Sequence, residues 1–391
     1  MIEKHWSFSP VDTWFFRESR PYDSIGGTQL NSLFPPSART VAGAVRSLIG
    51  EQVDVNWKAF EKGDGTQHRL SPINLCEQIG DANQLGQLRL VGPYLLYDKQ
   101  RLYPVPLIVL DGTIRDKKAP YQQQSVRLRP GEPVECDLGK VKLPKLAPLS
   151  SQSKTIENAK PIENAWLTAE DLGYVLAGDI PHSTMSQSKL FDIEPRVGIA
   201  LDRQKRTVKE GMLYQNQHIR VRHYLDLQIG LTVGGIEKAL HPTQTGLVRF
   251  GGEGRLAEVT VSDSLPATLP HPEKLNNTKN IFLTLLTPAH LDGHWLPNGF
   301  TEQRDKDGCQ VWRGKLNGVE LTIISAVLGK SIREGGWDLA NERPREVISL
   351  IPAGSVWFCR VESGNPADLH GHHIGKETEL GRGELAVGVW K

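Results

Sequence analysis

Two glycine-rich phrases are the sequence features best suited to receive a ligand against the backbone. Gly252-Glu253-Gly254-Arg255 precedes the strand-like run 256–261, and Gly381-Arg382-Gly383 precedes the apolar run 385–390. Glycines adopt backbone angles that are closed to residues with a Cβ, and they leave amide N–H groups accessible to a close ligand. Both phrases fit Gly-x-Gly-x-Leu-Ala and each ends a plausible folding unit, so the chain reads as two related halves. A plain turn between two elements is the alternative interpretation.

A second candidate is a cationic strip on a predicted helix. Ser37 is a suitable N-cap, and Arg39, Gly43 and Arg46 recur at helical spacing on one face. Two arginines on either side of a glycine form a smooth positive surface that a phosphate backbone can approach closely. An ordinary solvated face remains the alternative. The opposite face is apolar and consists of Val41, Val45, Leu48 and Ile49.

The most basic segment of the chain reads as a β-hairpin. Strand-like runs over 194–199 and 211–231 enclose a charged stretch. Basic hairpins that protrude commonly touch nucleic acid, although a merely solvated hairpin fits the same pattern. Its cations are Arg203, Lys205, Arg206, Lys209, Arg220 and Arg222.

Two further phrases resemble catalytic loops without completing them. Gly335-Gly336-Trp337-Asp338 is similar to the metal-binding turn of palm-type polymerases and cyclases, which requires neighbouring carboxylates for two metal ions. Only Asp338 is present, so the site is predicted to be non-catalytic, and Trp337 either stacks on a base or packs against its loop. Gly329-Lys330-Ser331 ends like a P-loop, but Ile324 stands where the first glycine belongs.

The histidines offer no convincing metal site or acid–base pair. His290 and His294 have helical metal spacing but lack the adjacent glutamate of a zincin, and the cluster 370–373 has no nearby cysteine or paired acid. A histidine-based ribonuclease would need a general base and a group that stabilises the phosphorane charge. The candidates are His5, His218 and His223, and nothing around them singles out a pair. We therefore expect neither a metal nor a cofactor.

Composition limits the class of protein. The 391 residues suffice for two or three domains, and a net charge of +1 restricts any nucleic-acid surface to a local patch. The four cysteines are widely separated, and no run approaches the roughly 20 apolar residues that span a bilayer. These features predict a cytoplasmic protein without a membrane segment.

The order of predicted elements favours an α+β fold with two ferredoxin-like, RRM-related domains. Each half offers a strand, a helix or loop, further strands, and a glycine loop followed by a last strand. The expected domains are 1–261, with insertions over about 54–245 that include the basic β-hairpin, and 280–391, joined by a proline-rich linker at 262–279. We further expect a first strand over 5–17 and a linker or an exposed loop over 139–164.

Several phrases together resemble the third-subunit family of the type III-B CRISPR effector, the Cmr complex, within the RAMP superfamily. The similarity runs from the first predicted strand to the last, while residues 53–164 carry none of it. The phrases are 12–21 with Gly26-Gly27, 34–46, Gly335-Gly336-Trp337-Asp338, 353–356 and Gly381-Arg382-Gly383.

The resemblance implies a non-catalytic subunit that grips the 5′ repeat-derived tag of the CRISPR RNA. Its implied partners are the large polymerase-like Cmr subunit and the backbone RAMP subunits, with no role at a membrane. A processing endoribonuclease of the same superfamily, which would cleave repeat RNA through a histidine, is the alternative. Glu253 and Glu258 depart from an RNA-contacting loop, because their charge repels phosphate. The implied RNA-binding residues are Arg39, Gly43, Arg46, Gly252, Gly254, Arg255, Lys330, Gly336, Trp337, Gly381, Arg382 and Gly383.

Overall fold

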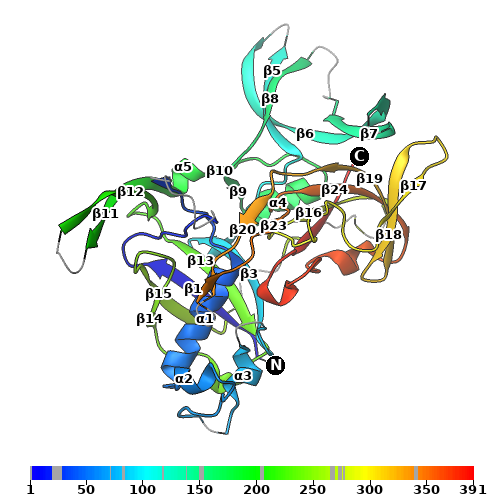
Figure 1. The fold of residues 1–391 in the computed structure, drawn as a ribbon. Coiled ribbons are helices and arrows are strands. Elements are labelled where there is room, and N and C mark those ends of the chain that lie inside the picture. Colours follow the sequence, from blue (N-terminus) through cyan, green and yellow to red (C-terminus); the bar gives the residue numbers. More distant parts are fainter. Residues whose placement is uncertain are drawn as a thin grey trace.

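The fold was analysed in a computed structural model of the chain (Figure 1). The structure describes residues 2–19, 29–70, 72–81, 84–116, 119–137, 139–148, 154–202, 207–264, 269–271, 275, 278–338 and 342–391. It is an α+β fold in which antiparallel strands dominate and helices are few. Two large sheets form its body, and two smaller β-structures project from them (Figure 1).

The first sheet is built from the first half of the chain. Its strand order is β10-β9-β4-β3-β13-β1-β15-β14. At its centre, β15, β1, β13 and β3 lie side by side, with each adjacent pair antiparallel. The bounds are β1 Lys4–Pro10, β3 Arg89–Tyr97, β4 Gln100–Pro104, β9 Ala165–Leu167, β10 Met185–Ser186, β13 Leu227–Gly234, β14 Gly246–Arg249 and β15 Leu256–Ser262.

Helix α1 (Ala38–Gln52) covers this sheet with the N-cap and the apolar face that its sequence predicts. The Ser37 hydroxyl accepts the amide N–H of Thr40, and the predicted apolar face is buried against the sheet. Two short helices, α2 (Trp57–Phe60) and α3 (Leu75–Ile79), complete this end. The expected first strand over 5–17 is too long: β1 stops at Pro10, and Trp14 instead bridges to Ile219 in the hairpin.

The second sheet repeats the central strand order of the first. Its order is β17-β18-β19-β24-β16-β25, so that β25, β16, β24 and β19 correspond in sequence order and in pairing to β15, β1, β13 and β3. The two strands that follow the glycine phrases therefore occupy equivalent places. The bounds are β16 Asn280–Leu285, β17 Thr301–Arg304, β18 Gln310–Leu316, β19 Val319–Val327, β24 Val356–Ser363 and β25 Leu385–Val389.

The two halves differ in their helices. Among the described residues between β16 and β25, the only helical turns are the 3-10 segments η3 (Pro366–Leu369) and η4 (Thr378–Leu380). One face of the second sheet is covered instead by α4 (Ala169–Leu176), which comes from the first half and is capped by Thr168. Leu172, Val175 and Leu176 pack there in one buried cluster with residues of β16, β24 and β25. The second sheet thus completes its core with a helix from the other half.

Two insertions project from the sheets. A four-stranded sheet of order β7-β6-β5-β8 lies at the top of Figure 1, and a hairpin of β11 (Phe191–Asp202) and β12 (Thr207–Val221) extends to the left, with β2 (Gln29–Leu30) beside it. The expected hairpin is confirmed. The expected loop over 139–164 is wrong, because β7 (Gly139–Leu146) and β8 (Lys154–Pro161) lie within it. The other strands are β5 (Val109–Asp116) and β6 (Ala119–Cys136), and the remaining short helices are α5 (Gln187–Leu190) and η1 (Lys238–Leu240).

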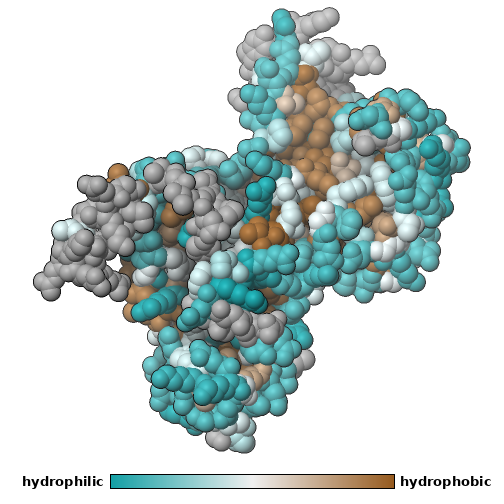
Figure 2. All heavy atoms as spheres, viewed as in Figure 1, coloured by the Kyte–Doolittle hydropathy of each residue, from teal (hydrophilic) through white to brown (hydrophobic). Residues whose placement is uncertain are grey.

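Most of the surface that faces the viewer in Figure 2 is hydrophilic, and hydrophobic side chains gather between the small sheet and the second sheet. Within the described ranges, no helix combines the length and the apolar character that crossing a membrane requires.

Shortening a buried side chain of α4 tests whether this helix belongs to the core of the second sheet. We expect Leu176→Ala to lower the free energy of unfolding by about 2–5 kcal/mol, because it leaves a cavity at a fully buried position. Glu170→Gln, at an exposed position of the same helix, is the matched control. Denaturant unfolding measures both variants, and an unchanged midpoint for Leu176→Ala would contradict this packing.

His241 predicts a loss of stability in mild acid. Its ring is fully buried, its Nδ1 accepts the indole N–H of Trp6 at 3.4 Å, and burial lowers its pKa to about 4. The folded protein therefore binds this proton less readily than the unfolded chain, so stability is complete above the unfolded pKa of about 6.5 and falls as the pH drops toward 4. The contribution is about 3 kcal/mol at most. Unfolding of wild type and His241→Gln from pH 7.5 to 4.5 measures it, and parallel pH curves would refute it.

Candidate nucleic-acid interface

A long segment of the second half, which we call the arm (described residues 329–338 and 342–350), reaches helix α1 of the first half. It contains β20 (Ile332–Glu334), β21 (Trp337–Asp338), β22 (Arg343–Pro344) and β23 (Ile348–Leu350). The Gly335 amide N–H donates to the Ser19 hydroxyl at 2.6 Å, and Arg39 Nε lies 3.7 Å from Glu334 Oε1. Three phrases that are distant in sequence, around Ser19, Arg39 and Gly335, therefore meet at one place.

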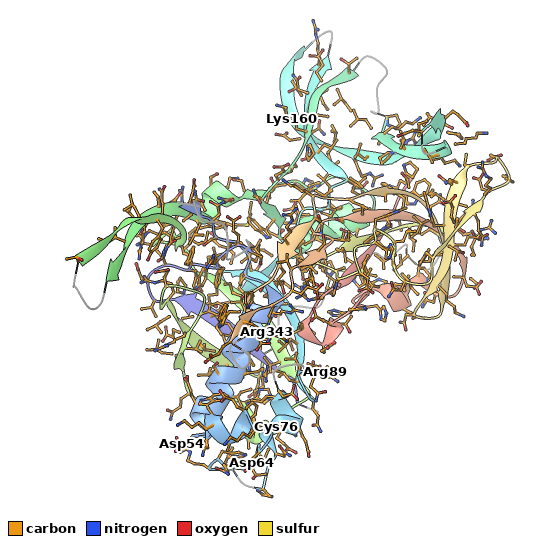
Figure 3. All side chains as sticks on the ribbon, in the orientation of Figure 1. Asp54, Asp64, Cys76, Arg89, Lys160 and Arg343 are labelled. Atoms are coloured by element: carbon orange, nitrogen blue, oxygen red, sulfur yellow. The ribbon has the colours of Figure 1, made fainter. Side chains whose placement is uncertain are left out.

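Helix α1 and the arm form a composite cationic surface. Arg46 donates to the Asp81 carbonyl oxygen at 2.5 Å, and burial lowers its pKa while the positive charge of nearby Arg345 lowers it further. Arg345 itself lies 3.5 Å from Asp338 Oδ2. In the view of Figure 3, Arg343 lies over helix α1, two residues before Arg345. Arg345 of the arm therefore lies near Arg46 of the helix, where the two positive charges repel each other, and the contacts of Arg39 with Glu334 hold the arm at the helix.

The exposed charges of the arm are of both signs. Lys330, Arg333 and Arg343 are exposed cations, while Glu342 and Glu346 are exposed carboxylates. The carboxylates of Glu334 and Asp338 are buried and paired, so they do not face solvent. Figure 2 shows hydrophilic side chains over the crossing of the arm and helix α1. We call this region, defined by Arg39, Gly43, Arg46, Arg333, Gly336, Trp337, Arg343 and Arg345, the α1–arm surface.

Two glycines leave the backbone of the α1–arm surface uncovered by side chains. Gly43 is exposed on helix α1, and an added Cβ there would meet nothing within 4 Å. Gly336 has a φ of +135°, a left-handed conformation that strains other residues, and it is equally open. Next to it, the Trp337 side chain is 44% exposed, which leaves part of the indole accessible to a stacking partner.

The terminal glycine phrase lies beneath this surface rather than on it. A Cβ at Gly381 would come within 2.1 Å of the Gly92 carbonyl oxygen, and one at Gly383 within 2.0 Å of the Ile374 carbonyl oxygen. Arg382 is 2% exposed. The expectation that this arginine and its flanking glycines approach RNA directly is therefore wrong for the chain as folded. These glycines allow the protein's own strands to come close.

Arg382 is instead the centre of a buried ion-pair network. Its Nη1 donates to Glu334 Oε2 at 3.2 Å, Nη2 makes a second bond to Glu334, and Nε lies 3.1 Å from Glu377 Oε2. Arg39 donates to Glu377 at 2.5 Å. Burial alone would raise the pKa of Glu377, but the hydrogen bond from Arg39 and the charges of Arg39 and Arg382 lower it. The network joins helix α1, the arm and the terminal glycine phrase.

A second buried pair lies at the same seam. Arg101 of β4 makes a bidentate interaction with Glu384, at 3.0 and 2.5 Å, and its guanidinium lies over the rings of Tyr94 and Tyr103. The negative charge of Glu384 raises the pKa of Arg101, although burial opposes it. Burial raises the pKa of Tyr94 to about 12.

The first glycine phrase belongs to a different site, at the base of the hairpin. The Gly252 N–H donates to the Phe15 carbonyl oxygen at 2.7 Å, while Gly254, with a φ of +64°, is exposed and open. Arg255 donates to Asp12 at 3.2 Å. Asp12 also accepts from Arg196 at 2.9 Å and from Arg220 at 3.0 Å. We call Asp12 with these three arginines the Asp12 cluster.

The predicted cations at the hairpin tip are not among the described side chains. Arg203, Lys205 and Arg206 lie outside the described residues, as do Gly26 and Gly27 of the N-terminal phrase, and the side chain of Lys209 is not described.

The histidines do not assemble a catalytic site in the described part of the chain. His218 is buried, with Nδ1 2.9 Å from the Thr13 hydroxyl, and burial lowers its pKa. Burial also lowers the pKa of His5, which stacks on Tyr94. His223 packs against Tyr224 beyond β12. Among the described residues, no group of three His, Cys, Asp or Glu side chains could hold a metal ion.

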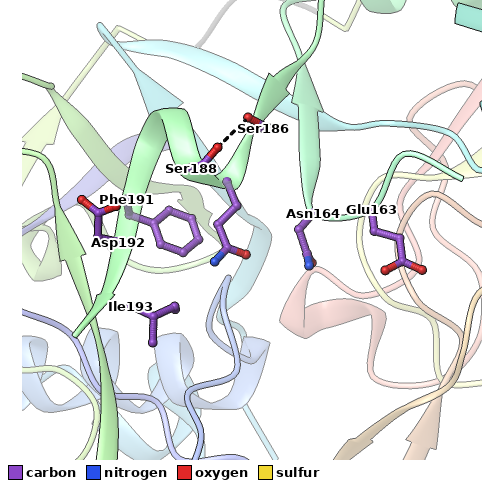
Figure 4. A pocket seen from close by; sticks show the side chains of 8 residues that line it. Glu163, Asn164, Ser186, Ser188, Phe191, Asp192 and Ile193 are labelled. Atoms are coloured by element: carbon purple, nitrogen blue, oxygen red, sulfur yellow. Dashed lines mark hydrogen bonds between the residues drawn. The ribbon is translucent and has the colours of Figure 1, made fainter. Parts of the chain in front are cut away.

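A shallow hollow of about 350 Å³ opens at the root of the hairpin (Figure 4). Its two carboxylates, Glu163 and Asp192, lie on opposite sides, and Asp192 pairs with Arg222 at 3.1 Å. The Ser186 and Ser188 hydroxyls bond each other at 3.1 Å. This arrangement provides no activated nucleophile beside a base.

With this geometry in place, comparison with known proteins identifies the class. A sequence model of the family described as CRISPR-associated protein (Cas_Cmr3) matches residues 6–390. The chain therefore belongs to this family of CRISPR-associated proteins. The resemblance to the third subunit of the type III-B Cmr complex is thereby confirmed.

Individual relatives are more distant. Over 173 residues the chain is 27% identical to the CRISPR system CMR subunit Cmr3 of Saccharolobus solfataricus, which covers 44% of this chain and 46% of that protein, so the match spans about half of the relative. Chains from two cryo-EM structures of the Type III-B Cmr-beta bound to cognate target RNA, one of them also with AMPPnP, align at 16% identity with a TM-score of 0.48. Each alignment covers 90% of this chain and 86% of the other.

Sequence reasoning missed the arm arginines and the role of Asp12. Arg333, Arg343 and Arg345 lie in a polar stretch without periodicity, so only the fold shows that this stretch belongs to the arm and that Arg345 lies near Arg46 of helix α1. Asp12 stood inside the N-terminal phrase, but nothing in its spacing links it to Arg196 or Arg220. An unusual local excess of arginine around one acid becomes visible only in three dimensions.

Removal of Arg382 distinguishes a structural role from an RNA contact. We expect Arg382→Ala to lower the free energy of unfolding by about 3–5 kcal/mol, because it leaves the buried Glu334 carboxylate without its main partner. The double variant Arg382→Met with Glu334→Gln should recover much of that loss. Denaturant unfolding measures both, and a fully stable Arg382→Ala variant would speak for a ligand-binding role instead.

Proposed function

We propose that this chain is the Cmr3 subunit of a type III-B Cmr complex and that it binds the 5′ repeat-derived tag of the CRISPR RNA without catalysing a reaction. The observation that carries this proposal is the α1–arm surface. Membership of the family supplies the class of complex, and the surface supplies the chemistry: arginines for phosphate, open glycines for close approach and an exposed indole for stacking.

The arrangement of charge suits a subunit that reads backbone and shape. Guanidinium groups bind phosphate oxygens in a bidentate manner but carry no base information, so base pairing of the guide would supply target recognition. With a net charge of +1, only a strip of the surface is basic, and the other faces remain for protein. We infer contacts there with the large polymerase-like subunit and the backbone RAMP subunits, in the cytoplasm.

The strand orders support a finer description of the fold. In each half the four central strands run fourth, first, third, second in chain order, with antiparallel neighbours, as in a ferredoxin-like unit. We infer two such units, 1–261 and 280–391, with the linker 262–279 between them. The second unit departs from the pattern because it has no α-helix between its described central strands and takes α4 from the first.

A processing endoribonuclease remains the alternative function, and no described site favours it. His5 and His218 are packed against aromatic rings, and within the described part of the chain neither is hydrogen-bonded to a carboxylate. Metal-independent cleavage of a repeat RNA by the purified chain, abolished by one His→Ala substitution, would establish that alternative.

Exposed arginines of the arm provide the direct test. We expect Arg343→Ala and Arg333→Ala each to weaken binding of a labelled guide RNA several-fold. The salt dependence, as the slope of log K against log salt concentration, should fall by about 0.7 for each lost phosphate contact with single-stranded RNA. The measurement is a fluorescence anisotropy titration of the full chain at several salt concentrations.

The matched control is Lys306→Ala, which removes an exposed cation in the β17–β18 turn, on the far side of the second sheet (Figure 1). Equal losses for Lys306 and the arm variants would mean that only net charge matters. Unchanged affinity for the arm variants would reject the α1–arm surface as the RNA site.

A further inference from the structure

The arginines of the Asp12 cluster outnumber the carboxylates that accept their hydrogen bonds. Arg196 comes from β11, Arg220 from β12 and Arg255 from the first glycine phrase, and all three donate to one carboxylate at 2.9–3.2 Å. Glu194 accepts from two of them, Arg196 at 2.6 Å and Arg220. Within this set of hydrogen bonds, three guanidinium groups thus face two carboxylates. The exposed carboxylates of Glu253 and Glu258 lie outside the set.

The cluster is accessible from solvent. The Asp12 side chain is 47% exposed, and those of Arg196, Arg220 and Arg255 are 31%, 43% and 26% exposed. Surface ion pairs of this kind contribute little to stability, typically below about 1 kcal/mol each. An incoming anion therefore loses little by competing with Asp12 for the same donors.

The surroundings confirm that the arginines converge. The positive charges of Arg196 and Arg255 both act on His218 and, after burial, lower its pKa further. The hydrogen bond from Arg220 is the largest influence that lowers the pKa of Glu194 to about 2. Gly254, which follows the exposed Glu253, leaves the backbone beside Arg255 open, since an added Cβ would meet nothing within 4 Å.

We propose that Arg196, Arg220 and Arg255 form a second phosphate-binding subsite for RNA, separate from the α1–arm surface, and that Asp12 occupies it in the absence of RNA. The carboxylate of Asp12 holds the three guanidinium groups in place, and a backbone phosphate takes over its hydrogen bonds when RNA binds. Arginine suits this exchange because its planar fork donates to carboxylate and phosphate oxygens in the same geometry.

One RNA strand can reach both sites. Asp12 and Ser19, which touches the arm, are separated by seven residues, and a fully extended segment of that length spans at most about 25 Å. The inference rests on the proposed RNA-binding function but concerns residues that the α1–arm surface does not contain.

Asp12→Asn tests the exchange through the sign of its effect. If Asp12 competes with phosphate, its neutralisation should tighten binding of a labelled single-stranded guide RNA to the full chain at least threefold at low salt. It should also steepen the salt dependence by about 0.7, corresponding to one more phosphate contact. Arg220→Ala should weaken binding several-fold and make the salt dependence correspondingly shallower.

Asp307→Asn is the matched control, because it removes an exposed carboxylate in the distant β17–β18 turn. A variant Asp12→Asn that binds RNA no more tightly than Asp307→Asn would overturn the proposal. If arm variants lose RNA while the Arg220 and Asp12 variants do not change, this subsite is rejected and the proposed function stands. If the wild-type chain binds no RNA, both fail.

A measurement on the unaltered protein covers the case in which Asp12→Asn loosens the hairpin. An arginine-specific reagent should modify Arg196, Arg220 and Arg255 of the wild-type chain more slowly when guide RNA is bound, as read by peptide mass spectrometry. Equal modification with and without RNA would overturn the subsite.

Discussion

The structure depends on charges buried at the seam between its two sheets. Arg382 with Glu334 and Arg101 with Glu384 are almost fully removed from water, and such groups are tolerated only when each charge is paired. Because each pair joins segments that are far apart in the chain, these segments must come together before the charges can be buried. The terminal glycine phrase makes this possible, since its glycines let the chain pass within contact of two other backbones. The position of the arm against helix α1 follows from these pairs.

Local features of the sequence predicted local structure well. Ser37 and the apolar spacing behind it predicted helix α1, and strand-like runs around a charged stretch predicted the hairpin, because capping and periodicity act between residues close in the chain. Residues 139–164 were misjudged for a physical reason. Their strands belong to a small sheet whose faces are only partly buried, so lysine, proline and serine are acceptable there and the composition resembles that of a loop.

The candidate site was predictable only in part. Arg39, Gly43 and Arg46 could be grouped from the sequence because they share one helix. The contact between Ser19 and Gly335 joins residues 316 positions apart, which no spacing rule indicates. Gly-Arg-Gly was ambiguous for a deeper reason. The same pattern results whether the missing side chains make room for a ligand or for the protein's own backbone. The position of Glu334 next to Arg382 and of the Gly92 carbonyl group next to Gly381 decides between the two.

The packing of α4 from the first half against the second sheet also affects how the chain folds. Strand β25 comes near the end of the sequence, yet the helix that covers its sheet was completed some two hundred positions earlier. During synthesis β4 and β9 of the first half can already pack against this helix, but the part of its apolar surface that meets the second sheet stays uncovered. Such exposed surfaces favour association with other chains. Contacts of this sequence separation also slow folding, because the loop that they close must lose its entropy first. Because α4 packs in one cluster with strands of the second sheet, separating the two halves of the chain would leave the second sheet without part of its core.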